Sequence, residues 1–282
     1  MKVIDAHLHF SNIKRFVNTA RTISCVDYSS EGLKKEFAKA NVSVGVAMGV
    51  VEMHDKAFPD AHSENPMGIN LEENIPAQLK YCIGINPFSI KKRDIARLEN
   101  ELKKSSVVGI KLYPGYYPFN ILDSVYTSVY ELAEEYQMPV VIHMGDTFSY
   151  RGYLEFAHPL TVNQLAANFK DVNFVIAHFG NPWVIDTAVV LSNNTNVFTD
   201  LSGLIVGDKS KINGLSRNQL FIDNIRRGLV YEEFYNKVMF GSDWPLVPIK
   251  NYIEFIKLLI PERYYEDVFW KTAQRVFKKL DV

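Results

Sequence analysis

The chain has 282 residues, of which 47% are hydrophobic and 22% charged, and its formal net charge is −1. These proportions are typical of a soluble globular protein with enough apolar material for a continuous core. Basic residues are dispersed and no apolar run is long enough to cross a bilayer, which argues against nucleic-acid and membrane partners. Two cysteines, Cys25 and Cys82, lack the spacing of a disulfide framework or metal motif, and no signal peptide precedes the first apolar run. We therefore expect a cytoplasmic protein.

Short apolar runs recur along the chain and predict eight strands. Between them lie segments with helical periodicity, such as residues 91–104, where Ile95, Leu98 and Leu102 share one face. A second helix is expected over residues 123–138, capped by Asp123 or Ser124. Strands that alternate with helices indicate βαβ units and a parallel sheet. The eight runs cover residues 2–8, 42–50, 81–88, 107–114, 139–145, 173–180, 196–203 and 237–245.

Eight such units favour a closed barrel over an open sheet. No Gly-rich phosphate fingerprint follows the first strand, where an open nucleotide-binding sheet would carry one. No linker or repeat divides the chain, and its longest loop-like stretch, residues 53–74, follows the second strand. The expected fold is α/β, a single (β/α)8 TIM barrel that occupies residues 1–282 as one domain.

Polar residues stand at the ends of several predicted strands. His7 and His9 close the first strand, and because side chains alternate along a strand, both should project the same way. Lys111 ends the fourth strand, His143 the fifth, His178 the sixth and Asp243 the eighth. In a barrel the carboxyl ends of the strands converge on one face, where the chemistry takes place. Imidazole and carboxylate together are the usual ligands of catalytic zinc.

This ordered set resembles the amidohydrolase superfamily of metal-dependent barrels. The fragments GIKLYP, VVIHMG, VIAHFG and FGSDWP are similar to its amidohydrolase-related branch, which contains hydrolases, lactonases and decarboxylases. The resemblance implies that His7, His9, His143 and Asp243 bind one divalent metal, with zinc as the first choice and Mn²⁺ as an alternative. It also implies catalytic roles for His178, beside the metal-activated water, and for Asp243, which takes the proton of that water.

The resemblance leaves the metal count open at Lys111. In binuclear relatives a lysine of the fourth strand is carbamylated and bridges two ions, so Lys111 is either such a bridge to a second ion or a site residue beside a single one. We favour a single ion. Asp5 precedes the histidine pair and either holds one imidazole or pairs elsewhere.

Five further residues are candidates for the wall of the substrate pocket, and so for substrate binding, because they follow strands of the barrel: Tyr113, Tyr116, Arg151, Trp183 and Trp244. Arg151 in particular could hold a substrate carboxylate in a bidentate grip. Specificity in this fold resides in loops, so the sequence names no substrate, and it leaves the formation of a homo-oligomer open.

The expected function is that of a metal-dependent hydrolase, which uses metal-activated water on a small-molecule amide, ester or lactone. The alternative is a metal-dependent non-oxidative decarboxylase of a small unsaturated or aromatic acid, because both chemistries use a Lewis-acidic ion beside an acid/base group. A metal-dependent nuclease is disfavoured, since a related group of barrels has a carboxylate where Lys111 stands and ETD in place of GSD. A noncatalytic metal-binding barrel is the remaining alternative.

Overall fold

The computed structural model describes residues 1–11, 13–49, 75–90, 92–148, 152–231, 233 and 235–280. Within them, eight parallel strands form one sheet in the order β1 to β8, which confirms the expected TIM barrel. All eight strands lie within or beside the runs identified in the sequence. They are β1 Val3–Leu8, β2 Val42–Met48, β3 Leu79–Gly84, β4 Val107–Leu112, β5 Val140–Ile142, β6 Phe174–Ile176, β7 Val197–Asp200 and β8 Val238–Met239.

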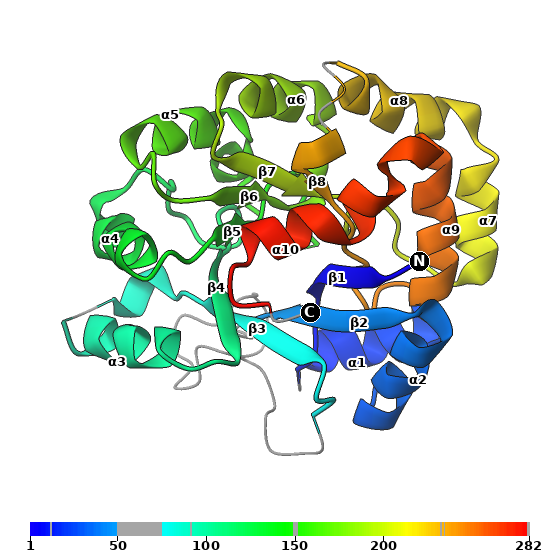
Figure 1. Cartoon of the computed structure of the whole chain (residues 1–282), viewed down its shortest axis with the longest axis horizontal. Helices are drawn as coiled ribbons and strands as arrows, with labels where there is room; N and C mark the ends of the chain where they lie inside the picture. The colour runs from blue at the N-terminus through cyan, green and yellow to red at the C-terminus, as the bar shows by residue number, and fades with distance from the viewer. Residues whose placement is uncertain are drawn as a thin grey trace.

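Helices surround the strands, as Figure 1 shows. The predicted helix over residues 91–104 is present as α3, and the one over residues 123–138 begins with a short 3-10 turn. Asp123 does not cap that helix through its side chain, because its carboxylate accepts a hydrogen bond from the backbone of Asn120 instead. The helices are α1 Lys14–Thr19, α2 Ser30–Ala40, α3 Lys92–Leu102, α4 Thr127–Glu135, α5 Leu160–Asn168, α6 Val184–Asn193, α7 Lys209–Ser216, α8 Gln219–Leu229, α9 Ile249–Leu259 and α10 Thr272–Val276.

The first and last strands meet through backbone hydrogen bonds. Ala6 N donates to Phe240 O over 2.9 Å, and Asp243 N donates to His7 O over 2.8 Å. Helix α10 lies across the near end of the barrel in Figure 1, and its Ala273 and Val276 pack into the interior cluster. Helix α10 thus covers the amino ends of the strands and leaves their carboxyl ends accessible.

Irregularities in strand register determine which side chains enter the barrel. Between β3 and β4 the pairing moves from Tyr81 with Val107 to Cys82 with Gly109, so β4 carries one extra residue. Such a bulge reverses the faces of the residues that follow it. Val108 therefore belongs to the interior cluster, and Lys111, an odd number of residues later, also points inward. The register of β1 against β2 shifts in the same way between Asp5 and Leu8.

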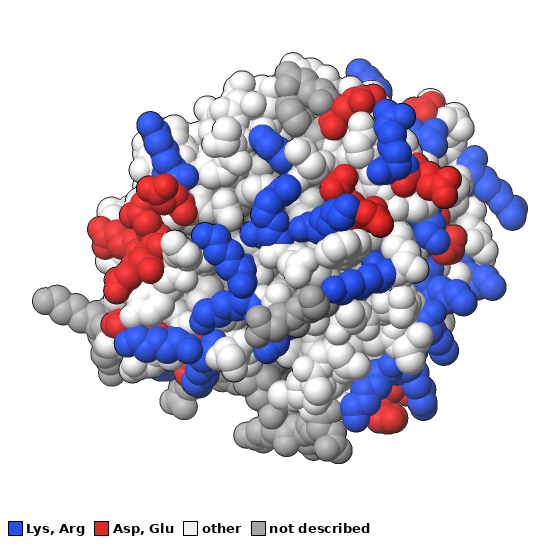
Figure 2. Space-filling view, in the orientation of Figure 1, with Lys and Arg blue, Asp and Glu red and all other residues white. Residues whose placement is uncertain are grey.

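The outer surface carries charges of both signs. Figure 2 shows Lys and Arg side chains spread over the face that α10 covers, with acidic side chains gathered over α4. None of the helices in the described ranges is long and apolar enough to span a membrane.

Candidate metal centre

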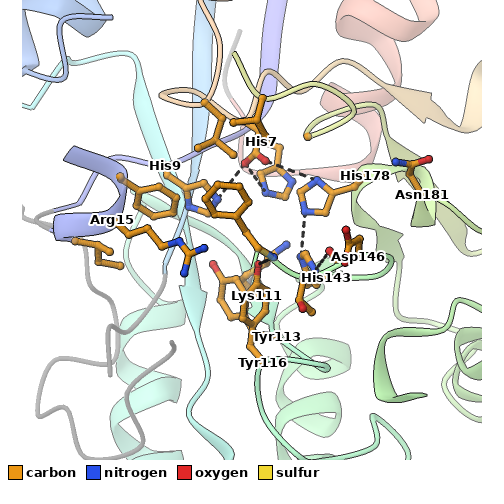
Figure 3. A pocket seen from close by; sticks show the side chains of 18 residues that line it. His7, His9, Arg15, Lys111, Tyr113, Tyr116, His143, Asp146, His178 and Asn181 are labelled. Atoms are coloured by element: carbon orange, nitrogen blue, oxygen red, sulfur yellow. Dashed lines mark hydrogen bonds and ion pairs between the residues drawn. The ribbon is translucent and has the colours of Figure 1, made fainter. Parts of the chain in front are cut away.

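A cavity of about 180 Å³ lies at the carboxyl ends of the strands (Figure 3). It brings together all four residues implied as metal ligands, together with His178, Lys111 and Tyr113. Further polar side chains come from α1 and from the loops after β4, β5 and β6. The apolar lining comes mainly from α1 and from the loops after β5, β7 and β8. These further lining residues are Ile13, Arg15, Phe16, Tyr116, Asp146, Thr147, Phe148, Asn181, Gly203, Val206 and Leu246.

Asp243 lies at the centre of the polar cluster in this cavity. His9 Nε2 is 3.1 Å from its Oδ1, and His7 Nε2 is 3.7 Å from the same oxygen. The other carboxylate oxygen, Oδ2, is 3.9 Å from His178 Nδ1. The chain reaches this position with a left-handed backbone at Asp243, where φ is 60°. Strained backbone of this kind is common at functional sites.

Gly203 lies against His178 and Asp243, where the space admits no larger side chain. Gly203 has a φ of +65°, and a Cβ at this position would lie 2.6 Å from His178 Nδ1 and 2.9 Å from Asp243 Oδ2. A larger residue would therefore displace both groups.

Asp200, at the end of β7, determines the protonation of His7. Its Oδ2 lies 2.9 Å from His7 Nδ1. Burial raises the pKa of the Asp200 carboxyl, but the charge and hydrogen bond of His7 and a hydrogen bond from Ser202 hold this pKa below its usual range. An ionised carboxylate only accepts hydrogen bonds, so we assign the proton of His7 to Nδ1 and leave Nε2 with a free lone pair.

Asp200 is not among the residues predicted from the sequence, although its position carries a signal. The run NVFTD ends on this carboxylate at the carboxyl end of the seventh strand, the same position that drew attention to the histidines of strands five and six.

The residues present fit a divalent metal ion. His7 Nε2 and Asp243 Oδ1 are buried atoms with no hydrogen-bond partner among the described residues, and they face each other as two acceptors. The ligand atoms of His7, His9 and Asp243 lie within 4.8 Å of one another. Only a proton or a cation can interact favourably with both lone pairs. Imidazole nitrogens and a carboxylate are typical zinc ligands, and a second carboxylate, Asp200, holds one of the imidazoles in place.

The protonation states of the site also suit a metal. Burial lowers the pKa of His7, brings that of His178 to about 4, and lowers that of His143 well below its usual range. For Asp243, burial raises the pKa, but the 3.1 Å contact with His9 Nε2 and the neighbouring histidines lower it by more. At neutral pH these imidazoles are neutral and the carboxylate is anionic, the forms that bind metal ions.

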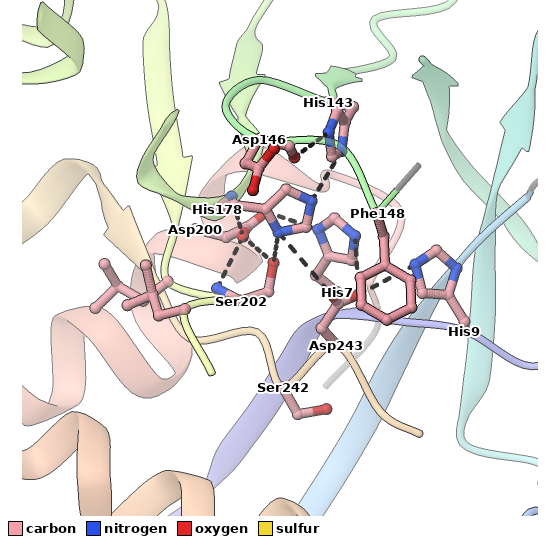
Figure 4. Close-up of polar contacts among 12 residues, drawn as sticks. His7, His9, His143, Asp146, Phe148, His178, Asp200, Ser202, Ser242 and Asp243 are labelled. Carbon is pink, nitrogen blue, oxygen red and sulfur yellow. Dashed lines mark hydrogen bonds and ion pairs between the residues drawn. The ribbon is translucent and has the colours of Figure 1, made fainter. Parts of the chain in front are cut away.

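His143 and His178 form a second group beside the first (Figure 4). His178 Nε2 is 3.1 Å from His143 Nδ1, and His143 Nε2 is 3.1 Å from the carbonyl oxygen of Asp146. His178 Nδ1 lies 2.9 Å from Ser202 Oγ, which also contacts Asp200. His178, His7 and Asp200 also have ligand atoms within 4.8 Å of one another. In this arrangement His143 faces His178 more directly than it faces Asp243.

Of the residues predicted for the pocket wall, the structure brings Tyr113 and Tyr116 into the cavity lining. Trp244 is fully buried and packs against Tyr28 at a ring distance of 4.9 Å, so it does not form a pocket wall. Trp183 does not line the cavity either, because its ring packs against His158. Arg151 lies outside the described residues.

Asp5 contacts the backbone of His7, whose N–H donates to Asp5 Oδ1 over 3.4 Å, but none of the imidazole rings of the described residues. Its carboxylate accepts hydrogen bonds from the hydroxyl and the backbone N–H of Ser242, at 2.6 and 2.9 Å. Burial raises the pKa of this carboxyl to about 7. Asp5 therefore holds the residue that precedes Asp243, and it contacts no imidazole nitrogen in the described chain.

Arg15 and Phe148 were not singled out in the sequence, and they meet at the cavity. The Arg15 guanidinium lies 4.4 Å from the centroid of the Phe148 ring. The backbone N–H of Phe148 donates to Tyr116 Oη over 2.8 Å, which ties the loop after β5 to the loop after β4. No local pattern marks Arg15, since it is an ordinary exposed position of α1.

A parallel eight-stranded barrel whose open end carries four imidazoles and two buried aspartates has the architecture of a barrel enzyme with side chains that can hold a metal ion. The chain matches the Amidohydrolase family over residues 4–279 and therefore belongs to it. No curated protein sequence matches the chain.

Solved structures share this fold at low sequence identity. An uncharacterized TIM-barrel protein from Bordetella bronchiseptica is 17% identical, with a TM-score of 0.71 and 99% of each chain covered. A 2,6-dihydroxybenzoate decarboxylase in complex with 2,6-dihydroxybenzoate is 14% identical, with a TM-score of 0.69 and 99% of each chain covered. A probable 2-pyrone-4,6-dicarboxylic acid hydrolase from Acinetobacter baumannii, with citric acid bound, is 17% identical. Its TM-score is 0.65, with 99% of this chain and 100% of that chain covered.

We expect about one tightly held transition-metal ion per chain, because one carboxylate, Asp243, faces the histidine pair while Asp200 is occupied by hydrogen bonds. Elemental analysis of protein purified without added metal measures this number. Two equivalents retained after dialysis, together with a modified Lys111, would contradict the mononuclear assignment.

Substituting Asp200 with asparagine should weaken metal binding by about 10- to 100-fold, the usual effect of losing a carboxylate that supports a ligand histidine. The new amide would donate to His7 Nδ1 and move the imidazole proton to Nε2, which then points at the metal site. Competition with a chromophoric chelator measures the affinity. Asp171→Asn, at an exposed position, is the matched control, and an unchanged affinity in Asp200→Asn would show that Asp200 does not support a ligand.

Proposed function

We propose that the chain is a metal-dependent hydrolase of a small ester, lactone or amide. The observation that carries this proposal is that the two carboxylate oxygens of Asp243 face different groups. Its Oδ1 faces the unpartnered His7 Nε2 and His9, whereas its Oδ2 faces His178. One carboxylate thus serves the metal site with one oxygen and offers the other to a reacting water.

The metal would be held by His7, His9, His143 and Asp243, with zinc as the proposed ion. When bound, such an ion polarises a substrate carbonyl and lowers the pKa of water. His143 contributes to this set on the strength of the family resemblance and its place in the cavity wall.

The protein residues supply the proton transfers. A water adds its oxygen to the carbonyl carbon while the anionic Asp243 accepts one of its protons. The bond from that carbon to the leaving oxygen or nitrogen then breaks, and the leaving atom takes up a proton. His178, which is neutral at pH 7, lies beside Asp243 and orients the reacting group. Asp243 is buried and the His178 side chain is 12% exposed, so their interactions with the substrate are screened little by water.

Non-oxidative decarboxylation of a small aromatic acid is the second candidate. It is favoured by the aromatic rings of the cavity wall, since Phe16, Tyr113 and Tyr116 line the same space as the histidines. In that reaction the bond between the ring carbon and the carboxylate breaks, carbon dioxide leaves, and the ring carbon takes up a proton. The substrate of the structurally similar 2,6-dihydroxybenzoate decarboxylase is an acid of this kind.

One experiment separates the two reactions. Zinc-loaded enzyme is assayed against a panel of small lactones, esters and amides and a panel of aromatic acids, in water enriched in ¹⁸O. Hydrolysis places the label in the product acid, whereas decarboxylation releases inorganic carbon and leaves the product ring unlabelled. Release of carbon dioxide without any labelled acid would overturn the hydrolase proposal in favour of the decarboxylase, and no turnover on either panel would count against both.

A further inference from the structure

Two buried hydrogen-bond donors in the cavity wall have no acceptor. Lys111 Nζ and Tyr113 Oη both line the cavity, and neither has a hydrogen-bond partner among the described residues. Lys111 is 0% exposed and Tyr113 is 4% exposed. Both follow the bulge of β4, two residues apart, and the ammonium lies 5.2 Å from the centroid of the Tyr113 ring (Figure 3).

The carboxylates nearby do not satisfy this pair. Asp243 is engaged with His9, and Asp200 accepts from His7, Ser202 and the backbone of His178. An ammonium group can only donate, and burial keeps the Tyr113 hydroxyl protonated by raising its pKa well above the usual value. Two donors that are withdrawn from water therefore lie in the wall of a cavity that is open to a ligand. The group that would satisfy both is an anionic oxygen.

The size and lining of the cavity limit the molecule that carries this oxygen. A cavity of about 150 Å³ is large enough for benzene, so about 180 Å³ accommodates a single ring with small substituents. The rings of Phe16 and Tyr116 line the same space and provide apolar surface for a planar molecule.

We propose that Lys111 and Tyr113 form an anion subsite that binds a carboxylate of the substrate. The substrate class is then a compact, single-ring carboxylic acid, and the carboxylate at this subsite is recognised and not consumed in the hydrolysis. This inference rests on the proposed function in one respect, that the cavity is the substrate site. It assigns Lys111 a role in specificity and leaves its amine unmodified.

Binding of benzoate and of its neutral isostere benzamide tests the subsite directly. Zinc-loaded full-length protein is titrated with each compound by calorimetry at pH 7. We expect benzoate to bind about 10-fold or more tightly than benzamide, in line with a charge-assisted hydrogen bond. The ratio should fall to near one in Lys111→Met and by about 3-fold or more in Tyr113→Phe. Lys80→Met is the matched control, because Lys80 donates to Ser105 O at the other end of the barrel.

The outcomes are separable. Equal binding of the two compounds by the wild-type protein would overturn the subsite. An unchanged ratio in Lys111→Met would also overturn it and would assign recognition of the carboxylate to the metal. If Lys111→Met does not fold, Tyr113→Phe decides, since it removes only a hydroxyl group. A carbamate signal on Lys111 in ¹³C-bicarbonate NMR would also overturn the proposal.

The proposed function fails independently of the subsite. Selectivity for benzoate that depends on Lys111, without turnover of any ester, lactone or amide, contradicts the hydrolase alone. Turnover of acidic and neutral esters with equal KM contradicts the subsite alone.

Discussion

Replacing Asp243 with alanine is expected to remove both the bound metal and the activity, with kcat falling by about 1,000-fold or more. The substitution deletes the oxygen that faces His7 and His9 and the oxygen that faces His178. It also leaves two buried imidazoles without their shared anionic partner. Metal content by elemental analysis and kcat for the best substrate measure the two effects.

Asp243→Asn separates these two roles. The amide keeps the shape of the side chain and one ligand oxygen, so part of the metal should remain, but the base is lost. Asp171→Ala, at an exposed position, is the control for the loss of a carboxylate as such. Full metal content and wild-type kcat in Asp243→Ala would refute the assignment of Asp243 to the centre.

The second large effect is expected at His178. His178→Asn should retain close to wild-type metal content while kcat falls by about 100-fold or more, the usual contribution of a positioned acid/base group. The reason is that in the proposed centre His7, His9, His143 and Asp243 would provide four ligands, and a fifth would crowd the position that water and substrate require. The left-handed backbone of His178, with φ of 59°, turns the side chain towards Asp243 at the end of β6.

The contacts of His178 make this test discriminating. Its Nδ1 faces Ser202 and its Nε2 faces His143, and its ligand atoms also lie near those of His7 and Asp200. Joint loss of metal and activity would therefore make His178 a ligand and favour a binuclear centre, and retention of both would make it a packing residue. His158→Asn is the matched control, since His158 packs on Trp183 outside the cavity lining.

The strands of the barrel could be read from the sequence because each is a short apolar run covered on both sides. A strand buried in this way needs no alternation of polar residues, so its composition alone marks it. The boundaries were less certain: β5 and β6 each have three residues, and the histidines that follow them lie outside the strands. Of the two expected caps, Asp123 and Ser124, Asp123 occupies the N-cap position of the 3-10 turn, but its carboxylate accepts a hydrogen bond from the backbone of Asn120 and none from the turn.

The outline of the site was also present in the sequence. The spacing of His7 and His9 follows from the period of a strand, and the convergence of His143, His178 and Asp243 follows from the parallel arrangement of the barrel. These residues do line one cavity. Their roles as ligands and catalysts remain predictions for the experiments above.

Only the tertiary structure decided how these groups are connected. Whether Asp200 reaches His7, 193 positions away, depends on two strands that are joined through β8. Lys111 points inward because an extra residue in β4 reverses the alternation, and a bulge leaves no mark in the hydrophobic pattern. Trp244 follows Asp243 directly, but its burial against Tyr28 removes it from the cavity. The sequence by itself determined which residue types stand at the ends of the strands, because the apolar runs and their boundaries are local features of the residue order. The distances between remote side chains are set only when the barrel closes.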